Sequence, residues 1–319
     1  MDKAALEEII LNINERTGIR NEILEKDYYV CLILKEISVK QKQLKAYFKG
    51  GTALYKILNH MNRFSEDIDL TVKINKNESN NSNKTRLKKS ALSYDIKYLE
   101  LIKEDTIDKK GSIIAFYKYD SLFSINELFK SEKIQIEATS FTISEPTSTY
   151  RIEPLIYKYA AAKEKETLRK KYNIMDFDIE IITLERIFID KIFAAEFYYI
   201  RNMYDDTSKH IYDITILMKN KKIKTFLKNK KEVLKIVGYK RQEELLRKGG
   251  IDEEKMISNF EYLKPLSNEL LKSFNKMQKI YVLDEKSIVT LKEIENTFKE
   301  LHCIFKEIEE EYNLNVVHE

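Results

Sequence analysis

The sequence predicts an α+β protein, with a mixed β-sheet domain over residues 1–170 and a helical domain over residues 171–319. In the first part, short runs rich in β-branched and apolar residues alternate with helical patterns. A polar-to-apolar shift near Asn173 then leads into apolar residues at helical spacing. The 319 residues are enough for two domains of ordinary size.

The composition indicates a packed protein, since 43% of the residues are hydrophobic and 34% are charged. Cys31 and Cys303 lie far apart in apolar helical patterns, which favours a reducing cytoplasm and argues against disulfides or a zinc site. No apolar run reaches about 18 residues, and the N-terminal residues lack the layout of a signal peptide. We therefore expect a soluble cytoplasmic protein with no membrane partner.

The formal net charge of +4 is spread unevenly. Residues 219–250 hold twelve Lys and Arg against three acids, an excess of nine, so the rest of the chain carries 4 − 9 = −5. A basic module beside a more acidic one suits a polyanionic substrate. Contact with an RNA backbone is one interpretation of this basic segment, and a solvated helix face is the other.

Two helices are predicted ahead of the sheet. The first spans residues 3–15 and ends near Thr17-Gly18. The second, Asn21–Ser38, is apolar on more than one side, so we expect it to lie between other elements.

A strand, a glycine turn and a helix follow as one unit. The apolar run Ala46–Phe48 is typical of a strand, and the helical pattern Thr52–Met61 starts directly after Gly50 and Gly51. Glycines let the backbone come close to a ligand, and the first N–H groups of a helix suit a phosphate.

The next strand carries two acids. Residues 67–72 alternate acid and apolar, so Asp67 and Asp69 should project from one face while Ile68 and Leu70 enter the core. Two such carboxylates beside a phosphate-binding turn suit a divalent metal on a triphosphate.

These residues resemble a known family. Gly-Gly-Thr, a helix and Ser-Glu-Asp-Ile-Asp-Leu resemble the first motif of the DNA polymerase beta-type nucleotidyltransferase superfamily. Within it, the chain is similar to the AbiEii/AbiGii toxin family, which includes the MenT-type toxins, through Gly50, Gly51, Thr52, Ala53, Leu54, Arg63, Ser65, Asp67 and Asp69. The resemblance implies a nucleotidyltransferase-fold sheet domain with a helical C-terminal domain.

The same pattern extends upstream of the glycine strand. Residues 24–29, Leu-Glu-Lys-Asp-Tyr-Tyr, resemble the family pattern at this position. We interpret them as a charge cluster at the start of a helix. The alternative is that Lys26 reaches the site.

The remaining sheet domain is predicted to contain a mobile loop at 75–83, a helix at 85–102 and strands at 113–119 and 133–141. A site of the superfamily type needs a third carboxylate on a neighbouring strand, to activate the acceptor hydroxyl or bind a second metal. Glu137 is the one acid on the polar face of the last strand, and an ordinary solvent-facing acid is the alternative. Pro146 and Pro154 bracket a connection.

Two charges interrupt apolar helix patterns in the second domain. Lys191 falls on the apolar stripe of the predicted helix 183–203, and Asp213 lies in an apolar run of the helix that follows. A buried ammonium is costly unless it meets an anion, so Lys191 faces a carboxylate or a phosphate. Pairing with Asp213 is the simplest solution.

The resemblance extends to these helices. Leu184-Glu185-Arg186 through Asp190-Lys191, with His210-x-Tyr212-Asp213, is similar to the lysine and aspartate motifs of the family. It implies that Lys191 contacts the phosphates of the nucleotide and that Asp213 helps to form its pocket, which is compatible with a mutual pair. His210 contacts substrate or packs. After Gly249-Gly250, helices at 252–280 and 284–312 are predicted to form a cap or an interface.

The resemblance implies transfer of a nucleoside monophosphate from an NTP, with release of pyrophosphate. In that scheme Gly50, Gly51 and Thr52 hold phosphates, while Asp67 and Asp69 bind two Mg²⁺ ions about 4 Å apart. Arg63 and Lys191 neutralise phosphate charge, although Arg63 could equally pair with an acid in the turn. Ser65 donates to a phosphate or caps the turn, Glu137 activates the acceptor hydroxyl, and Asp213 orients the nucleotide.

The acceptor that the resemblance implies is RNA, at the 3′ end of tRNA. The protein would then be the toxin of a toxin–antitoxin or abortive-infection (phage defence) pair, with an antitoxin protein as partner. Transfer to a small molecule or a protein is one alternative, and a non-catalytic nucleotide- or RNA-binding module is another. The basic segment argues against a small acceptor, and the three intact acids argue against a non-catalytic module.

Overall fold

The computed structural model describes residues 3–60, 62–75, 77–123 and 132–317, with side chains as far as residue 311. Met61 and Lys76, which fall in the predicted helix 52–61 and the predicted loop 75–83, lie outside the described residues. The chain divides into a first unit, Met1–Ile182, and a second unit, Thr183–Glu319. The division follows Ile182 and not residue 170, because the last strand before it belongs to the sheet of the first unit.

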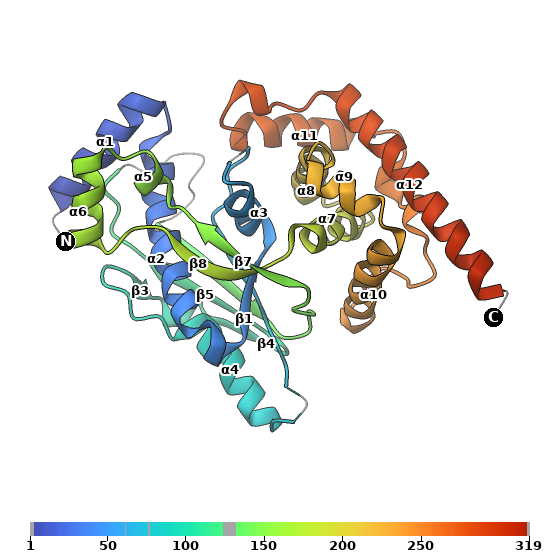
Figure 1. Cartoon of the computed structure of the whole chain (residues 1–319), viewed down its shortest axis with the longest axis horizontal. Helices are drawn as coiled ribbons and strands as arrows, with labels where there is room; N and C mark the ends of the chain where they lie inside the picture. The colour runs from blue at the N-terminus through green and yellow to red at the C-terminus, as the bar shows by residue number, and fades with distance from the viewer. Residues whose placement is uncertain (1–2, 61, 76, 124–131, 318–319) are drawn as a thin grey trace. The chain divides into compact units, whose positions relative to one another are not determined.

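The first unit contains an eight-stranded mixed sheet in the order β3-β5-β6-β2-β1-β8-β7, with β4 paired to β5 (Figure 1). The strands are β1 (Ala46–Lys49), β2 (Ile68–Val72), β3 (Glu100–Leu101), β4 (Ile107–Lys109), β5 (Ser112–Lys118), β6 (Lys133–Thr139), β7 (Thr147–Ile152) and β8 (Phe177–Ile182). The pairs β1·β8 and β2·β6 are parallel, and the others are antiparallel.

The predicted α+β class and four predicted strands are confirmed, but the sheet also contains strands that the sequence did not predict. Strands β7 and β8 lie in the stretch interpreted as a connection and as the start of the helical part. In β8 the buried residues alternate with Asp178 and Glu180, so the strand has one buried face.

In the described part of the first unit, the helices that accompany the sheet are α1 (Lys3–Thr17), α2 (Asn21–Leu44), α3 (Gly50–Leu58), α4 (Asn80–Leu92), α5 (Leu155–Lys158) and α6 (Ala162–Tyr172). Helices α2 and α4 pack against strands of the sheet and against each other (Figure 1). The expectation that α2 lies between other elements is confirmed, because it contacts α1, α4, α5 and β8.

The predictions around α4 are partly wrong. The helix begins at Asn80, inside the predicted loop, because Ser79 caps it by accepting a hydrogen bond from the Ser82 backbone N–H at 3.1 Å. It ends at Leu92, and Glu100–Leu101 is a strand, not the last turn of a helix.

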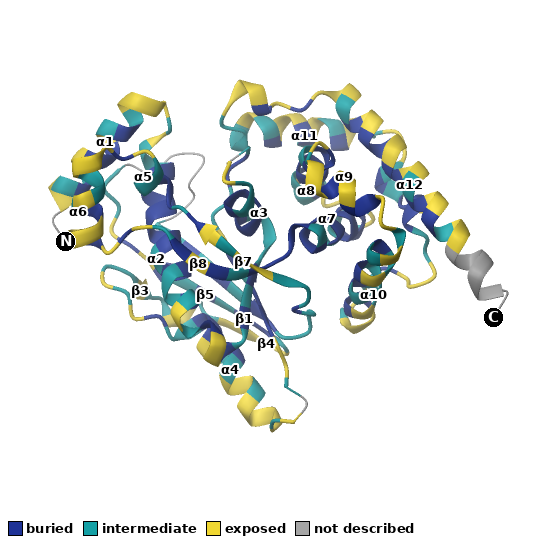
Figure 2. Ribbon diagram, viewed as in Figure 1, coloured by how far each residue is buried: buried dark blue, intermediate teal, exposed yellow. Residues whose placement is uncertain are grey.

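The core of the first unit lies between the sheet and these helices. Figure 2 shows the central strands mostly buried, while α4 exposes one side to solvent. Ile68 and Leu70 are fully buried, as the alternation predicted, and so is Phe48, which pairs with Leu70.

The second unit is built from α7 (Leu184–Tyr199), α8 (Tyr204–Met218), α9 (Lys221–Leu227), α10 (Lys230–Leu246), α11 (Asn268–Tyr281) and α12 (Leu291–Val317). Helix α8 contacts α7, α9, α11 and α12 and is the centre of this unit. The helices predicted around Lys191 and Asp213 are confirmed as α7 and α8.

The predicted helix 252–280 is wrong in its first half. Short 3₁₀ turns at Ile257–Asn259 and Glu261–Leu263 precede Pro265, and α11 starts only after Ser267, whose hydroxyl accepts from the Leu270 N–H. Proline restricts the residue before it to extended backbone, which ends helical structure there.

Both cysteines are free, as expected, but only Cys31 is buried, whereas Cys303 is exposed. None of the helices in the described part of the chain is both long enough and apolar enough to span a membrane.

Candidate functional site

The glycine turn brings the backbone against a carboxylate. Gly50 has a φ of +84°, a left-handed conformation that L side chains rarely adopt, and a Cβ built there would lie 2.0 Å from Asp69 Oδ2. Only glycine therefore allows Asp69 to stand this close to the first turn of α3. The sequence predicted that the glycines let the backbone come close to a ligand; the group that comes close to Gly50 in the structure is the Asp69 carboxylate.

The second glycine faces the turn that precedes β2. A Cβ at Gly51 would lie 2.8 Å from Ser65 Oγ and 3.1 Å from Arg63 Nη2. Thr52 Oγ1 lies 3.0 Å from Ser65 Oγ, and Arg63 donates to the Phe64 carbonyl at 3.1 Å. The residues of the first unit that are predicted to contact phosphates are thus gathered around the start of α3, where the side chain of the N-cap residue Lys49 does not cap the helix.

Two of the predicted acids, Asp69 and Glu137, lie side by side on neighbouring strands of the sheet. Asp69 pairs in register with Glu137 of the parallel strand β6 and with Lys49 of the antiparallel strand β1. Residues paired directly across a ladder project from the same face, so these three half-buried side chains share one side of the sheet. The predicted placement of Glu137 on a strand next to Asp69 is confirmed, and Lys49 is a member of the row that the sequence did not single out.

Asp67 is placed differently from Asp69. It is exposed and lies one residue ahead of β2, outside the ladder, so the prediction that both acids stand on the strand holds for Asp69 alone. Among the described side chains, no three His, Cys, Asp or Glu residues lie close enough to hold a metal ion by themselves. Mg²⁺ is usually bound by one or two carboxylates together with substrate phosphates. The carboxylates beside the Gly50 turn therefore fit Mg²⁺ when a nucleotide is present.

In the second unit, Lys191 Nζ lies 2.8 Å from Asp213 Oδ2, and the two side chains are 7% and 4% exposed. The predicted pairing of the two interrupting charges is confirmed. Removing either partner would leave an uncompensated buried charge, which makes the pair a structural requirement whatever else it does.

A family model described as nucleotidyl transferase AbiEii toxin, type IV toxin–antitoxin system, matches residues 32–284. The chain belongs to this family. It is therefore a nucleotidyl transferase of the toxin type, and membership implies a nucleotide substrate and an antitoxin partner. No curated protein gives a significant match to the chain.

The start of α2, ahead of the matched span, carries charges that are buried. Glu25, Lys26 and Asp27 are only 1%, 1% and 2% exposed. Our interpretation of them as a charge cluster at a helix start does not account for this burial. Each of three consecutive buried charges needs a partner. In this AbiEii-family chain, each of the three side chains contacts a different segment of the first unit.

Glu25 and Asp27 fix two of those segments. Glu25 accepts from the Leu122 N–H at 2.8 Å and from Ser121 Oγ at 2.7 Å, and burial raises its pKa. Asp27 accepts from Tyr55 Oη at 3.0 Å and from Lys56 Nζ at 2.5 Å, both on α3.

The Asp27 contact also keeps Lys56 charged. Burial is the largest single effect and would lower the pKa of Lys56, but Asp27 and Cys31 together more than offset it, and the pKa is raised. The same carboxylate accepts from the Leu155 N–H at 2.7 Å. Helix α3 of the AbiEii-family transferase is thus tied to α2 by a buried ion pair just beyond the glycine turn.

A second buried ionic cluster lies in the other unit, inside the lysine motif. Arg186, 1% exposed, donates to Asp190 Oδ1 at 3.0 Å and pairs with Glu243 of α10. Lys240 pairs with Glu243 at 3.1 Å and with Glu244 at 2.9 Å. Glu243 thus joins α10 to α7 through Arg186 and also neutralises Lys240 of the basic segment, which the charge count alone could not reveal.

The basic segment is consequently less available than its composition suggests. Lys219, Lys222 and Lys230 also form ion pairs, with Glu293, Glu185 and the acids Glu307 and Glu311. The lysines that remain exposed on α9 and just after it are Lys221, Lys224 and Lys228, which share one helix face opposite the buried residues Ile223, Phe226 and Leu227.

His210 of α8 packs against an aromatic ring. Its imidazole stacks on Tyr198 with ring centroids 5.4 Å apart and an interplanar angle of 11°. This contact favours the packing interpretation over contact with substrate.

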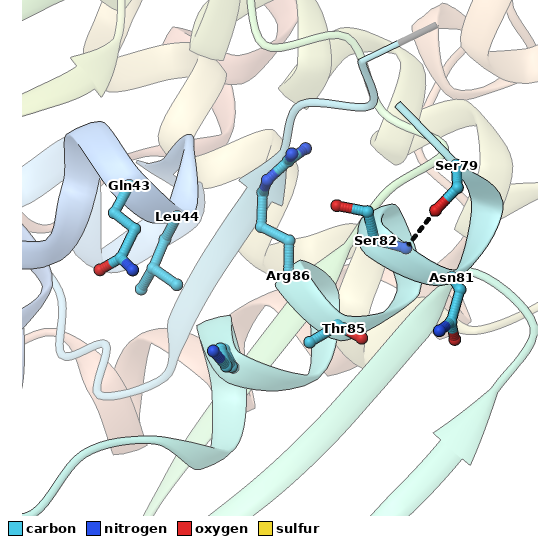
Figure 3. Close-up of a pocket in the computed structure, with 8 residues that line it drawn as sticks. Gln43, Leu44, Ser79, Asn81, Ser82, Thr85 and Arg86 are labelled. Carbon is cyan, nitrogen blue, oxygen red and sulfur yellow. Dashed lines mark hydrogen bonds between the residues drawn. The ribbon is translucent and has the colours of Figure 1, made fainter. Parts of the chain in front are cut away.

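A hollow of about 380 Å³ lies between the end of α2 and the first turns of α4 (Figure 3). It is lined by Gln43, Leu44, Ser79, Asn81, Ser82, Thr85, Arg86 and Lys89, and none of these is a predicted site residue. Arg86 pairs with Glu78 and donates to the Lys73 carbonyl, so its charge is already satisfied within the fold.

Proposed function

We propose that this nucleotidyl transferase moves a nucleoside monophosphate from an NTP to RNA in a Mg²⁺-dependent reaction, and that the acceptor is the 3′ end of tRNA. The observation that carries the proposal is the row of Asp69 and Glu137 on neighbouring strands, with the Gly50 backbone against the Asp69 carboxylate. Phosphate-binding groups and acids of this kind are what transfer from a triphosphate requires.

The start of α3 is our proposed binding site for the β- and γ-phosphates. The first N–H groups of a helix have no partner within the helix and carry a positive partial charge. Thr52 and Ser65 add hydroxyl donors, and the guanidinium of Arg63 adds a positive charge close to Gly51. Together they would orient the triphosphate with its α-phosphate toward the acids.

Asp67 and Asp69 would hold Mg²⁺, with Glu137 as a further ligand or as the base. When bound, Mg²⁺ offsets the negative charge that develops on the transferred phosphoryl group and on the leaving pyrophosphate. Asp69 is half-buried and Asp67 is exposed, so both carboxylates are accessible to solvent.

The reaction itself is a substitution at the α-phosphorus. The acceptor hydroxyl oxygen forms a bond to that phosphorus, the bond to the β-phosphate oxygen breaks, and pyrophosphate leaves. Glu137 takes the proton of the hydroxyl. For Lys191 and Asp213 we propose the roles that the resemblance implies, neutralisation of phosphate charge and formation of the nucleotide pocket.

The exposed lysines of α9 support RNA as the acceptor. Lys221, Lys224 and Lys228 present three positive charges on one face, and phosphate backbones bind such faces by releasing counterions. A small hydroxylated acceptor would gain nothing from this surface.

The first experiment incubates the purified full chain with total RNA, Mg²⁺ and each α-³²P-labelled NTP in turn. We expect label in tRNA-sized RNA with the wild type and with Asp178→Asn, which alters an exposed acid of β8, and no label with Asp67→Asn. A preparation that binds NTP but labels no RNA would overturn the RNA acceptor and favour a small-molecule or protein acceptor.

The second experiment measures RNA affinity as a function of salt. Replacing Lys221, Lys224 and Lys228 with Gln should reduce the slope of log K against log salt concentration by about 2–3, since each phosphate contact contributes about 0.7–0.9. The matched control replaces three exposed basic residues of α6 with Gln: Lys163, Arg169 and Lys170. An equal change in both triple variants would show that α9 is not the contact surface.

A further inference from the structure

Lys26 is the most enclosed charge near the proposed metal site. Its side chain is 1% exposed, and its ammonium lies 2.9 Å from Glu66 Oε2, whose side chain is 30% exposed. It also donates to the backbone carbonyl of Lys133 and lies 5.3 Å from the centre of the Tyr119 ring. The three contacts come from three segments that are far apart in the sequence.

Two of these segments carry the proposed acids. Glu66 directly precedes Asp67, and Lys133 is the first residue of β6, the strand that carries Glu137. The ladder between β2 and β6 begins only at the pair Ile68 and Ile136. Lys26 therefore connects the residue segments at the start of β2 and of β6, just ahead of the first pair of the ladder between these two strands.

This position matters for Asp67 in particular. Asp69 is held by the ladder, because it pairs in register with Glu137. Asp67 lies outside the ladder and is exposed, so the strand pairing does not fix it. The Lys26–Glu66 ion pair holds Glu66, the residue directly before Asp67.

The ammonium is well suited to this task. A charge taken out of water is stable only with close partners, so the Lys26 nitrogen strongly favours the geometry in which Glu66 and the Lys133 carbonyl both reach it. The Tyr119 ring, which lies next to the Lys26 ammonium, stacks on Tyr29 with ring centroids 4.3 Å apart. Tyr29 lies one turn along α2 from Lys26. An exposed pair would be far less restrictive.

We propose that Lys26 is a positioning residue, which sets the distance between Asp67 and Glu137 through Glu66 and the start of β6 and so tunes metal affinity. This inference rests on the proposed function, since it assigns a role to Lys26 only if Asp67 binds a metal. In this proposal Lys26 acts through its protein contacts and not by binding the metal or the nucleotide itself.

The test measures Mn²⁺ binding to the full chain in the presence of a non-hydrolysable NTP analogue, by electron paramagnetic resonance, with no turnover involved. We expect Lys26→Met to weaken Mn²⁺ binding about tenfold, which corresponds to about 1.4 kcal/mol. Glu66→Gln should act in the same direction, and its partly exposed side chain keeps the test valid if Lys26→Met fails to fold. Lys255→Met, which removes the lysine paired at 2.7 Å with the buried Glu196 in the second unit, should lower stability without changing Mn²⁺ affinity.

A double-mutant cycle separates positioning from general destabilisation. In an Asp67→Asn background, Lys26→Met should weaken Mn²⁺ binding no further, because the residue through which it acts is already altered. Additive effects, or unchanged Mn²⁺ affinity in folded Lys26→Met and Glu66→Gln, would overturn the positioning role alone. A wild type that binds no Mn²⁺ with the analogue would overturn the proposed metal site and the positioning role together.

Discussion

Replacing Gly50 with Ala tests whether the glycine turn determines where Asp69 stands. The positive φ of +84° costs a non-glycine residue about 1–2 kcal/mol by itself. The added Cβ would lie 2.0 Å from Asp69 Oδ2, so the carboxylate must rotate away or β2 must shift. A misplacement of about 1 Å at a reacting centre lowers the rate by roughly 10²-fold, and we expect a loss of that size in Gly50→Ala.

Gly18→Ala is the matched control. Gly18 also has a positive φ, +72°, but a Cβ there would meet nothing within 4 Å. It lies at the end of α1 in the same unit, so it carries the backbone cost without the overlap. Both variants should unfold at a melting temperature lower by about 2–8 °C, while only Gly50→Ala should lose activity.

The assay pairs thermal unfolding followed by circular dichroism with initial rates of label transfer from α-³²P-NTP to RNA. The informative quantity is the rate ratio of the two variants at equal folded fraction. If Gly50→Ala transfers label as fast as Gly18→Ala, the close approach of the turn to Asp69 does not control catalysis, and the role given to Gly50 is wrong.

The acids and the buried charges lead to three further expectations. Glu137→Gln should lower the transfer rate by about 10²–10⁴-fold, the usual contribution of a general base, with little change in melting temperature because the side chain is half-buried. Lys191→Met and Asp213→Leu should each destabilise the protein by about 3–5 kcal/mol in urea unfolding, and the double variant should recover most of that stability. Burial raises the pKa of Glu25 above its ordinary 4.5, so its favourable contribution is present below pH 4.5 and lost as the pH rises through the folded pKa. Urea unfolding of Glu25→Gln should therefore show a smaller fall in stability above pH 4.5.

Each of these has an outcome that contradicts it. A Glu137→Gln protein with wild-type rate would remove the base from the mechanism and leave Glu137 as an ordinary surface acid. A double variant at 191 and 213 that stays as unstable as the singles would mean that the uncompensated charge is not what destabilises the single variants. Equal pH profiles for Glu25→Gln and wild type would show that Glu25 titrates alike in the folded and unfolded chain.

Local patterns were enough for the part of the sheet that carries the acids. The strands β1, β2, β5 and β6 are short runs rich in β-branched or aromatic residues, and buried residues alternate with less buried ones along most of their length. Strands β7 and β8 were not predicted because prolines and a polar helix, α6, surround them, and β1, which pairs with β8, is far away in sequence. Pairing across such a distance leaves no trace in a local window.

The parts of the candidate site that depend on contacts between distant residues were likewise not predicted. Alternation placed Asp69 and Glu137 on polar strand faces, and the need for a third carboxylate on a neighbouring strand suggested that they meet. The 2.0 Å approach at Gly50 and the gathering of Arg63 and Ser65 at Gly51 depend on how the turn before β2 folds back, which sequence spacing does not fix. The partners of the basic segment depend likewise on α7 and α12.

The charges at the start of α2 could have been interpreted correctly from two expectations taken together. Successive helix residues point about 100° apart, so Glu25, Lys26 and Asp27 must face three different directions. A helix predicted to be apolar on more than one side is enclosed, and charges on an enclosed helix need partners on each side that they face. The structure supplies a loop, the paired starts of two strands and helix α3. Because the last two of these carry Asp67, Glu137 and the glycine turn, the buried charges of α2 hold together the elements from which the site is built.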